Sequence, residues 1–157
     1  MDHHILKRTT FIVANAKASA AFYQSVFGWT IWYDNIVKAD FRFPPSGAPD
    51  GAEVHLVILE VADPKIGKLG LLQYLDPPFD TGVARDRSKV RMGEAILVVE
   101  TPDVDGVHDR ALAAGARVVT APVDWEVPSP DGKSVIHLRT VSLFDPNGIY
   151  LEVSSHP

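Results

Sequence analysis

The chain has 157 residues, a formal net charge of −5, 46% apolar residues and no cysteine. The length suits one domain or two small units that share a core. The negative charge and the lack of a long basic run argue against nucleic acid as a partner. The absence of cysteine excludes a disulfide framework, a thiolate metal site and a cysteine nucleophile.

In chain order, the first half predicts a strand, a helix and three further strands. Asn15 is a plausible N-cap for a helix over 16–27, where Phe22 and Val26 share an apolar face. Gly28 follows at the position where a left-handed residue ends a helix at low cost. The four expected strands are 6–13, 29–36, 53–61 and 69–75.

The second half repeats this order of elements. A turn at Thr101-Pro102-Asp103 leads into a helix whose apolar face includes Val104 and Val107 and which Gly115 ends. The expected strands are 94–100, 117–125, 134–144 and 149–154. A β-α-β-β-β order that occurs twice indicates an internal duplication.

Three segments are expected to be irregular. The Pro-, Gly- and Asp-rich segment 44–51 predicts an exposed loop, and 77–91 predicts the connection between halves 5–76 and 92–155. Segment 124–133 predicts a long hairpin loop over a pocket. No segment is apolar enough to span a bilayer, and the N-terminus lacks the profile of a signal peptide. We therefore expect a cytoplasmic protein without a membrane partner.

Two signatures near opposite ends of the chain resemble the vicinal-oxygen-chelate superfamily, which includes glyoxalases, bleomycin-resistance proteins and extradiol dioxygenases. The first is Ser-Ala-Ala-Phe-Tyr-Gln-Ser-Val-Phe-Gly-Trp at 19–29, and the second is Asp-Pro-Asn-Gly-Ile-Tyr-Leu-Glu at 145–152. The resemblance implies one domain over 1–157 of the α+β class. Two βαβββ modules then form concave mixed sheets around a shared cavity.

The resemblance also implies where a divalent cation would be bound, because family enzymes take one ligand from the first and last strand of each half. The matching positions here are Arg8, Gln73, Glu94 and Glu152. A guanidinium has no lone pair to offer, so Arg8 cannot be a ligand. No histidine stands at these positions, and dioxygenase activity is therefore not expected.

Two interpretations of this set remain open. In the first, Gln73, Glu94 and Glu152 bind a divalent cation such as Mg²⁺, Mn²⁺, Ni²⁺ or Zn²⁺, and the metal stabilises an enediolate-like anion. In the second, which we favour, Arg8 neutralises the carboxylates and no cofactor is bound. Strand alternation places Glu94 with Ile96 and Val98 on one face.

Two functions follow from the resemblance. One is a glyoxalase-like lyase or isomerase acting on a small carbonyl or vicinal-oxygen compound, in which Glu94 or Glu152 acts as metal ligand or proton-transfer base. The other is a non-catalytic protein that sequesters an aromatic or antibiotic molecule. In either case Arg8, His137, Arg139 and Trp32 are the expected substrate-binding residues. Members of this length usually pair, so a homodimer is expected.

Overall fold

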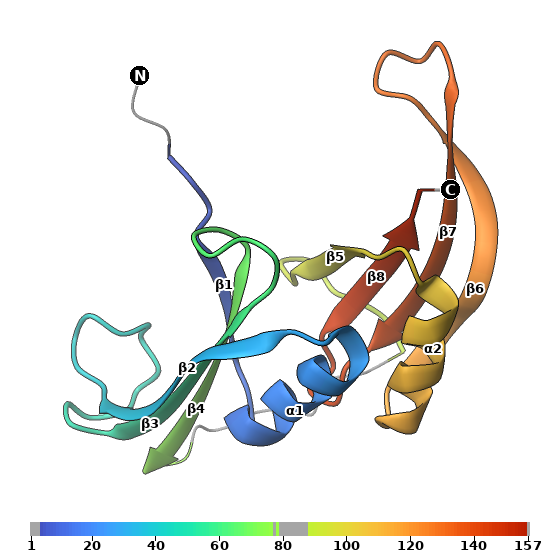
Figure 1. Ribbon diagram of the computed structural model, residues 1–157. Coiled ribbons are helices and arrows are strands. Elements are labelled where there is room, and N and C mark those ends of the chain that lie inside the picture. Colours follow the sequence, from blue (N-terminus) through green and yellow to red (C-terminus); the bar gives the residue numbers. More distant parts are fainter. Residues whose placement is uncertain (1–3, 77, 79–87, 157) are drawn as a thin grey trace. The chain divides into compact units, whose positions relative to one another are not determined.

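The chain forms two compact units, Met1–Ala84 and Arg85–Pro157. The structure is a computed structural model and describes residues 4–76, 78 and 88–156. Each unit contains one four-stranded mixed sheet and one α-helix in the order β-α-β-β-β (Figure 1). The predicted α+β class and the two βαβββ modules are therefore confirmed.

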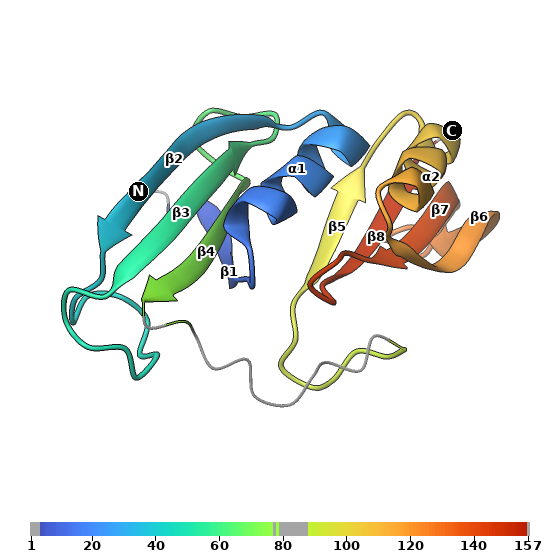
Figure 2. The same cartoon turned by 90° about the horizontal axis from the view of Figure 1, so that it is seen from below.

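The N-terminal unit has the sheet order β1-β4-β3-β2, with β1 parallel to β4 and the other pairs antiparallel. Its helix α1 lies across one face of this sheet, against β3 and β4 (Figure 2). The elements are β1 (Arg8–Ile12), α1 (Ala16–Phe27), β2 (Thr30–Lys38), β3 (Glu53–Glu60) and β4 (Lys68–Asp76).

Helix α1 begins and ends as its sequence predicts. The side chain of Asn15, the N-cap, accepts a hydrogen bond from the Ala18 N–H, and Gly28 ends the helix with φ 73°. Phe22, Tyr23 and Val26 are buried. Burying each of these large side chains contributes roughly 1.5–3 kcal/mol, so packing on the sheet stabilises the helix.

We call the sheet face that packs against the helix of its own unit the back face, and the other the front face. The Ala16 N–H at the start of α1 donates to Gln73 Oε1, which identifies the side of β4 that faces the helix. Residues paired in the register point to the same face. Arg8 is paired with Lys68 and Thr10 with Gly70, and these pairs lie on the front face.

The loop 39–52 covers one end of this front face. Ala39 and Ala52 close the loop through a backbone hydrogen bond of 2.8 Å. They belong to a buried cluster with Val54, Leu72 and Tyr74, and Phe43 packs against it. The loop is therefore only partly exposed, because its apolar residues pack on the front face at this end of the sheet.

The C-terminal unit has the equivalent sheet order β5-β8-β7-β6, with β5 parallel to β8. Helix α2 packs against β6, β7 and β8. The elements are β5 (Ile96–Glu100), α2 (Val104–Ala113), β6 (Arg117–Pro128), β7 (Val135–Phe144) and β8 (Tyr150–Ser155).

The expected hairpin loop is longer than the observed one, and the expected connection between the halves lies mostly outside the described residues. Strand β6 continues to Pro128, so the hairpin loop is 129–134, shorter than the expected 124–133. The expected connection 77–91 falls mostly outside the described residues, which here include only 78 and 88–91. Among the residues that the structure describes, neither helix is long and apolar enough to cross a membrane.

The turn before β8 forms as its sequence predicts. The side chain of Asp145 is buried and accepts hydrogen bonds of 2.8 Å from the N–H groups of Asn147 and Ile149. Gly148 has φ 81°, which a residue with a Cβ adopts only with strain. This turn sets the register of β8 and thereby the face on which Glu152 lies.

Candidate functional site

Glu152 lies on the front face of the C-terminal sheet. It is paired with Val98 on β5 and with Ser142 on β7. The adjacent pairs are Leu97 with Leu151 and Val99 with Val153, and their side chains point to the back face. The predicted alternation along β5 and β8 is therefore confirmed. Within its own unit, no described residue forms a hydrogen bond or ion pair with the partly buried Glu152 carboxylate.

A chain of hydrogen bonds holds a tryptophan on the same face. The indole N–H of Trp125 donates to Thr140 Oγ1 at 2.8 Å, and Thr140 Oγ1 lies 2.8 Å from Ser154 Oγ. Ser154 is two residues after Glu152 on β8 and points to the same side. Trp125 is still 41% exposed, so part of its ring remains open to a ligand.

Glu94 is placed differently from the expectation. It precedes β5, which begins at Ile96. Its side-chain Oε2 accepts a hydrogen bond from the Arg91 N–H, and its own N–H donates to the Arg91 carbonyl. Glu94 therefore belongs to the turn that leads into β5, and at least one of its carboxylate oxygens is engaged there.

Gln73 lies on the back face of the N-terminal sheet. Its amide oxygen accepts a 2.9 Å hydrogen bond from the Ala16 N–H at the start of α1. Arg8 is on the front face, because it is paired with Lys68, and odd-numbered residues of β4 point the other way. This corrects the expected grouping of Gln73 with Arg8, since a shift of one residue along a strand reverses the face.

The residue of β4 that corresponds to Glu152 is Gly70. Glu152 is paired with Val98 and Gly70 with Thr10, and each first-strand residue stands five positions before the N-cap of its helix. The last strand of the N-terminal unit therefore supplies no side chain at the position where the C-terminal unit has a carboxylate.

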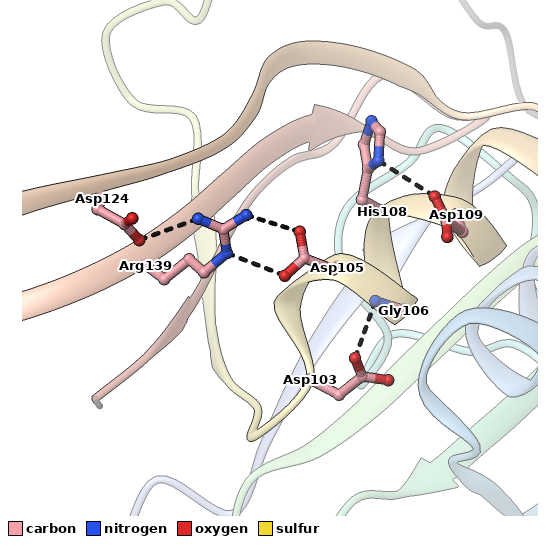
Figure 3. A network of polar contacts seen from close by, with 7 residues as sticks. All are labelled: Asp103, Asp105, Gly106, His108, Asp109, Asp124 and Arg139. Atoms are coloured by element: carbon pink, nitrogen blue, oxygen red, sulfur yellow. Dashed lines mark hydrogen bonds and ion pairs between the residues drawn. The ribbon is translucent and has the colours of Figure 1, made fainter.

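His137 and Arg139 share a face, as predicted, but it is the back face of the C-terminal sheet, where Arg139 meets Asp105 of α2 (Figure 3). Arg139 donates to both carboxylate oxygens of Asp105 on α2, at 2.7 and 2.9 Å, and to Asp124 Oδ1 at 2.9 Å. His137 Nδ1 lies 2.9 Å from Glu126 Oε1. Arg139 therefore joins helix to sheet, and its expected role in substrate binding stays a prediction.

The carboxylates around Arg139 change its titration. Hydrogen bonds to Asp105 and Asp124 raise the pKa of Arg139, and the hydrogen bond from Arg139 lowers the pKa of Asp105. Figure 3 also shows Asp103 accepting a hydrogen bond from the Gly106 N–H, which caps α2. The close-up thus shows a structural network in which charges stabilise the helix and its contact with the sheet.

Arg8 and Trp32 lie on the front face of the N-terminal sheet, on its two edge strands β1 and β2. Lys68 on β4 is paired with Arg8 in the register and contacts the Trp32 ring. The Lys68 ammonium is 3.5 Å from the centroid of the Trp32 ring and 3.6 Å from Glu60 Oε2. Sequence reasoning missed Lys68. The available signal was the alternation of β4, which places Lys68 on the face of Arg8 once the register is known.

Within the C-terminal unit, the described side chains around Glu152 do not fit a divalent cation. Among residues 4–76, 78 and 88–156, no three histidine, aspartate or glutamate side chains are grouped as a metal centre. Glu152 has Val98 and Ser142 beside it, and the corresponding position in the other unit is Gly70. One carboxylate with an apolar and a hydroxyl neighbour lacks the oxygen ligands that a hard cation needs.

Paired βαβββ modules with this strand order are the architecture of the vicinal-oxygen-chelate superfamily, to which the chain belongs. Within it, residues 8–153 match the glyoxalase-like domain family, and the chain is a member of that family. No curated protein matches the chain.

Solved structures share the fold at low sequence identity. A glyoxalase family protein from Bacillus cereus is 15% identical with a TM-score of 0.76, and the match covers 99% of this chain and 96% of that one. A glyoxalase/bleomycin resistance protein/dioxygenase family enzyme from Burkholderia phytofirmans is 17% identical with a TM-score of 0.56, covering 98% and 100%. A related domain from Frankia is 14% identical with a TM-score of 0.59, covering 99% and 100%.

Proposed function

We propose that this protein binds small aromatic molecules without a metal ion, as a binding or sequestering protein of the bleomycin-resistance type. The observation that carries the proposal is that Trp125 and Glu152 lie on the same face of one sheet. Trp125 is fixed by its hydrogen bond to Thr140 and keeps part of its ring exposed. The Glu152 carboxylate has no hydrogen-bond or ion-pair partner among the described residues of its unit.

The surroundings of Glu152 favour an aromatic ligand that carries a basic amine. Ile96 and Val98 point to the same face and are 47% and 72% exposed, which leaves apolar surface for a hydrocarbon or ring to cover. An ammonium group beside Glu152 would form a charge-assisted hydrogen bond, and the ring would stack on Trp125.

The test uses EDTA-treated, ¹⁵N-labelled protein and tryptamine as the probe. We expect saturable NMR shifts at the indole N–H of Trp125 and the amide of Val98. The Glu152→Gln variant should bind about ten-fold more weakly, since a hydrogen bond between charged partners is lost. Glu126→Gln, which changes an exposed carboxylate on the back face, is the matched control. Equal affinities of the two variants would contradict the proposal.

A second candidate function is supported by the same carboxylate. Glu152 is partly buried and has no partner among the described residues of its unit, which makes it a candidate general base. It would remove a proton from the carbon next to a carbonyl in a lyase or isomerase reaction. Exchange of that proton in heavy water, followed by NMR with hydroxyacetone, tests this role. Exchange that disappears in Glu152→Gln would favour the enzyme over the binding protein.

We also propose that the chain pairs as a homodimer. Each sheet has two edge strands, β1 and β2 in one unit and β5 and β6 in the other, and edge strands carry backbone groups that another chain can pair. Light scattering after gel filtration should give twice the chain mass of 17.2 kDa. A mass of one chain at all concentrations would contradict it.

A further inference from the structure

Lys68 is a buried cation beneath an exposed aromatic ring. Its side chain is only 4% exposed, and its ammonium lies 3.5 Å from the Trp32 ring centroid and 3.6 Å from Glu60. Trp32 itself is 55% exposed. The lysine therefore holds the ring from one side and leaves much of the indole open on the front face.

Arg8 lies next to Lys68, on strand β1, which pairs with β4. It is paired with Lys68 in the register and has no ion-pair partner within its own unit among the described residues. Gly70 makes room for it, because a Cβ there would stand 3.1 Å from Arg8 Cδ and 2.5 Å from Thr10 Oγ1. The stem of Arg8 thus lies over β4, with its guanidinium available to a ligand.

The charges on this end of the face favour an anion. Arg8 and Lys68 carry two positive charges and Glu60 one negative charge, which leaves an excess of one positive charge. A cation stacked on the open side of Trp32 would be repelled by the Lys68 ammonium across the ring. An aromatic ring bearing a carboxylate would instead be attracted by both cations.

We propose that the front face formed by Arg8, Trp32 and Lys68 binds a planar aromatic carboxylate. Trp32 stacks on the ring and Arg8 pairs with the carboxylate through its guanidinium fork. Lys68 is a positioning residue that orients Trp32 and sets the charge preference of its ring. The inference rests on the proposed binding of small aromatic molecules and gives the N-terminal unit a ligand class of its own.

The experiment compares three indole compounds that differ only in the charge of their side chain. Indole-3-acetate, indole-3-acetamide and tryptamine are titrated into the ¹⁵N-labelled full chain, and shifts are followed at the Trp32 indole N–H. Indole-3-acetate should bind there at least about ten-fold more tightly than tryptamine, as expected for one charge-assisted pair. Equal affinity of the three compounds at Trp32, or no shift there, would overturn the inference.

Variants separate the roles of the two cations. Arg8→Gln should weaken indole-3-acetate about ten-fold at Trp32. Arg42→Gln, which removes an exposed positive charge of the same unit, should not. Lys68→Met should raise the affinity of tryptamine at Trp32 relative to that of indole-3-acetate. If Lys68 had only a structural role, this ratio of affinities would stay unchanged. If this variant does not fold, the comparison of Arg8→Gln with Arg42→Gln is sufficient to test the inference.

The same spectra distinguish this inference from the proposed function. Tryptamine shifts at Trp125 without indole-3-acetate shifts at Trp32 would overturn the inference and leave the proposed function standing. Indole-3-acetate shifts at Trp125 alone would overturn it as well. The absence of shifts at both tryptophans would contradict both.

Discussion

Arg139 connects helix α2 to the long hairpin of the C-terminal sheet. It bonds two carboxylates, Asp105 on the helix and Asp124 on β6, and it lowers the pKa of Asp105. A carboxyl group whose pKa is lower in the folded than in the unfolded protein stabilises the fold above its unfolded pKa. That contribution is lost as the pH falls through the folded pKa.

Arg139→Gln is therefore expected to lower the melting temperature at neutral pH. The difference from the unaltered protein should shrink as the pH falls below the usual aspartate value of 3.8, because Asp105 then becomes protonated. Thermal melts followed by circular dichroism across this range measure it. Lys17→Gln is the matched control, since Lys17 is exposed on α1. A difference that does not depend on pH would contradict the ion-pair explanation.

The sheet face on which an individual side chain lies is the feature that is hardest to predict from this sequence. Strand alternation has a period of two, so the neighbours Gln73 and Tyr74 exchange faces with a shift of one residue. The sequence alone does not fix the register between β1 and β4, and the Gln73 position was for that reason assigned to the wrong face. His137 and Arg139 were correctly predicted to share a face, but only the contact of Arg139 with α2 identifies which face it is.

At the scale of elements, Gln73 ties the first helix to the sheet. Its amide oxygen accepts the hydrogen bond of the Ala16 N–H, one of the donors that a helix leaves unpaired at its start. This contact adds to the Asn15 N-cap. A strand residue on the back face therefore contributes to helix stability and needs no role in the site.

Gln73→Ala should lower the free energy of unfolding by about 1 kcal/mol, the usual effect of losing a helix-capping hydrogen bond. Urea denaturation measures this change. Gln24→Ala removes the same side chain from the exposed surface of α1 and should have almost no effect. Similar losses in both variants would show that the contact with Ala16 is unimportant, as would the absence of any loss in Gln73→Ala.

The helices and strands were easier to predict than the sheet face of a given side chain, because their ends depend largely on nearby residues. Asn15 and Gly28 mark the ends of α1 through capping chemistry that involves only nearby residues, and the helix bounds were predicted without error. Strand β6 passes Trp125 and reaches Pro128 because it pairs with β7 along a long hairpin. Such pairing depends on distant residues and cannot be seen in a local pattern.

At the scale of the whole molecule, the two units share an order of elements but differ in chemistry. Glu152 corresponds to Gly70, and the front face near Glu152 offers a carboxylate where the face near Lys68 offers cations. The duplication was predictable from the repeated pattern. The division of charge between the units was not, because it depends on the register within each sheet.

The measurement that tests the proposed metal-independent function most directly is the metal content of the purified protein by native mass spectrometry. The protein is stripped with EDTA and reloaded in turn with Mg²⁺, Mn²⁺, Ni²⁺ and Zn²⁺, alongside Glu152→Ala. We predict that no ion is retained under any loading, because no further carboxylate or imidazole among the described residues of its unit lies beside Glu152. One tightly held ion per chain that is lost in Glu152→Ala would contradict the proposal.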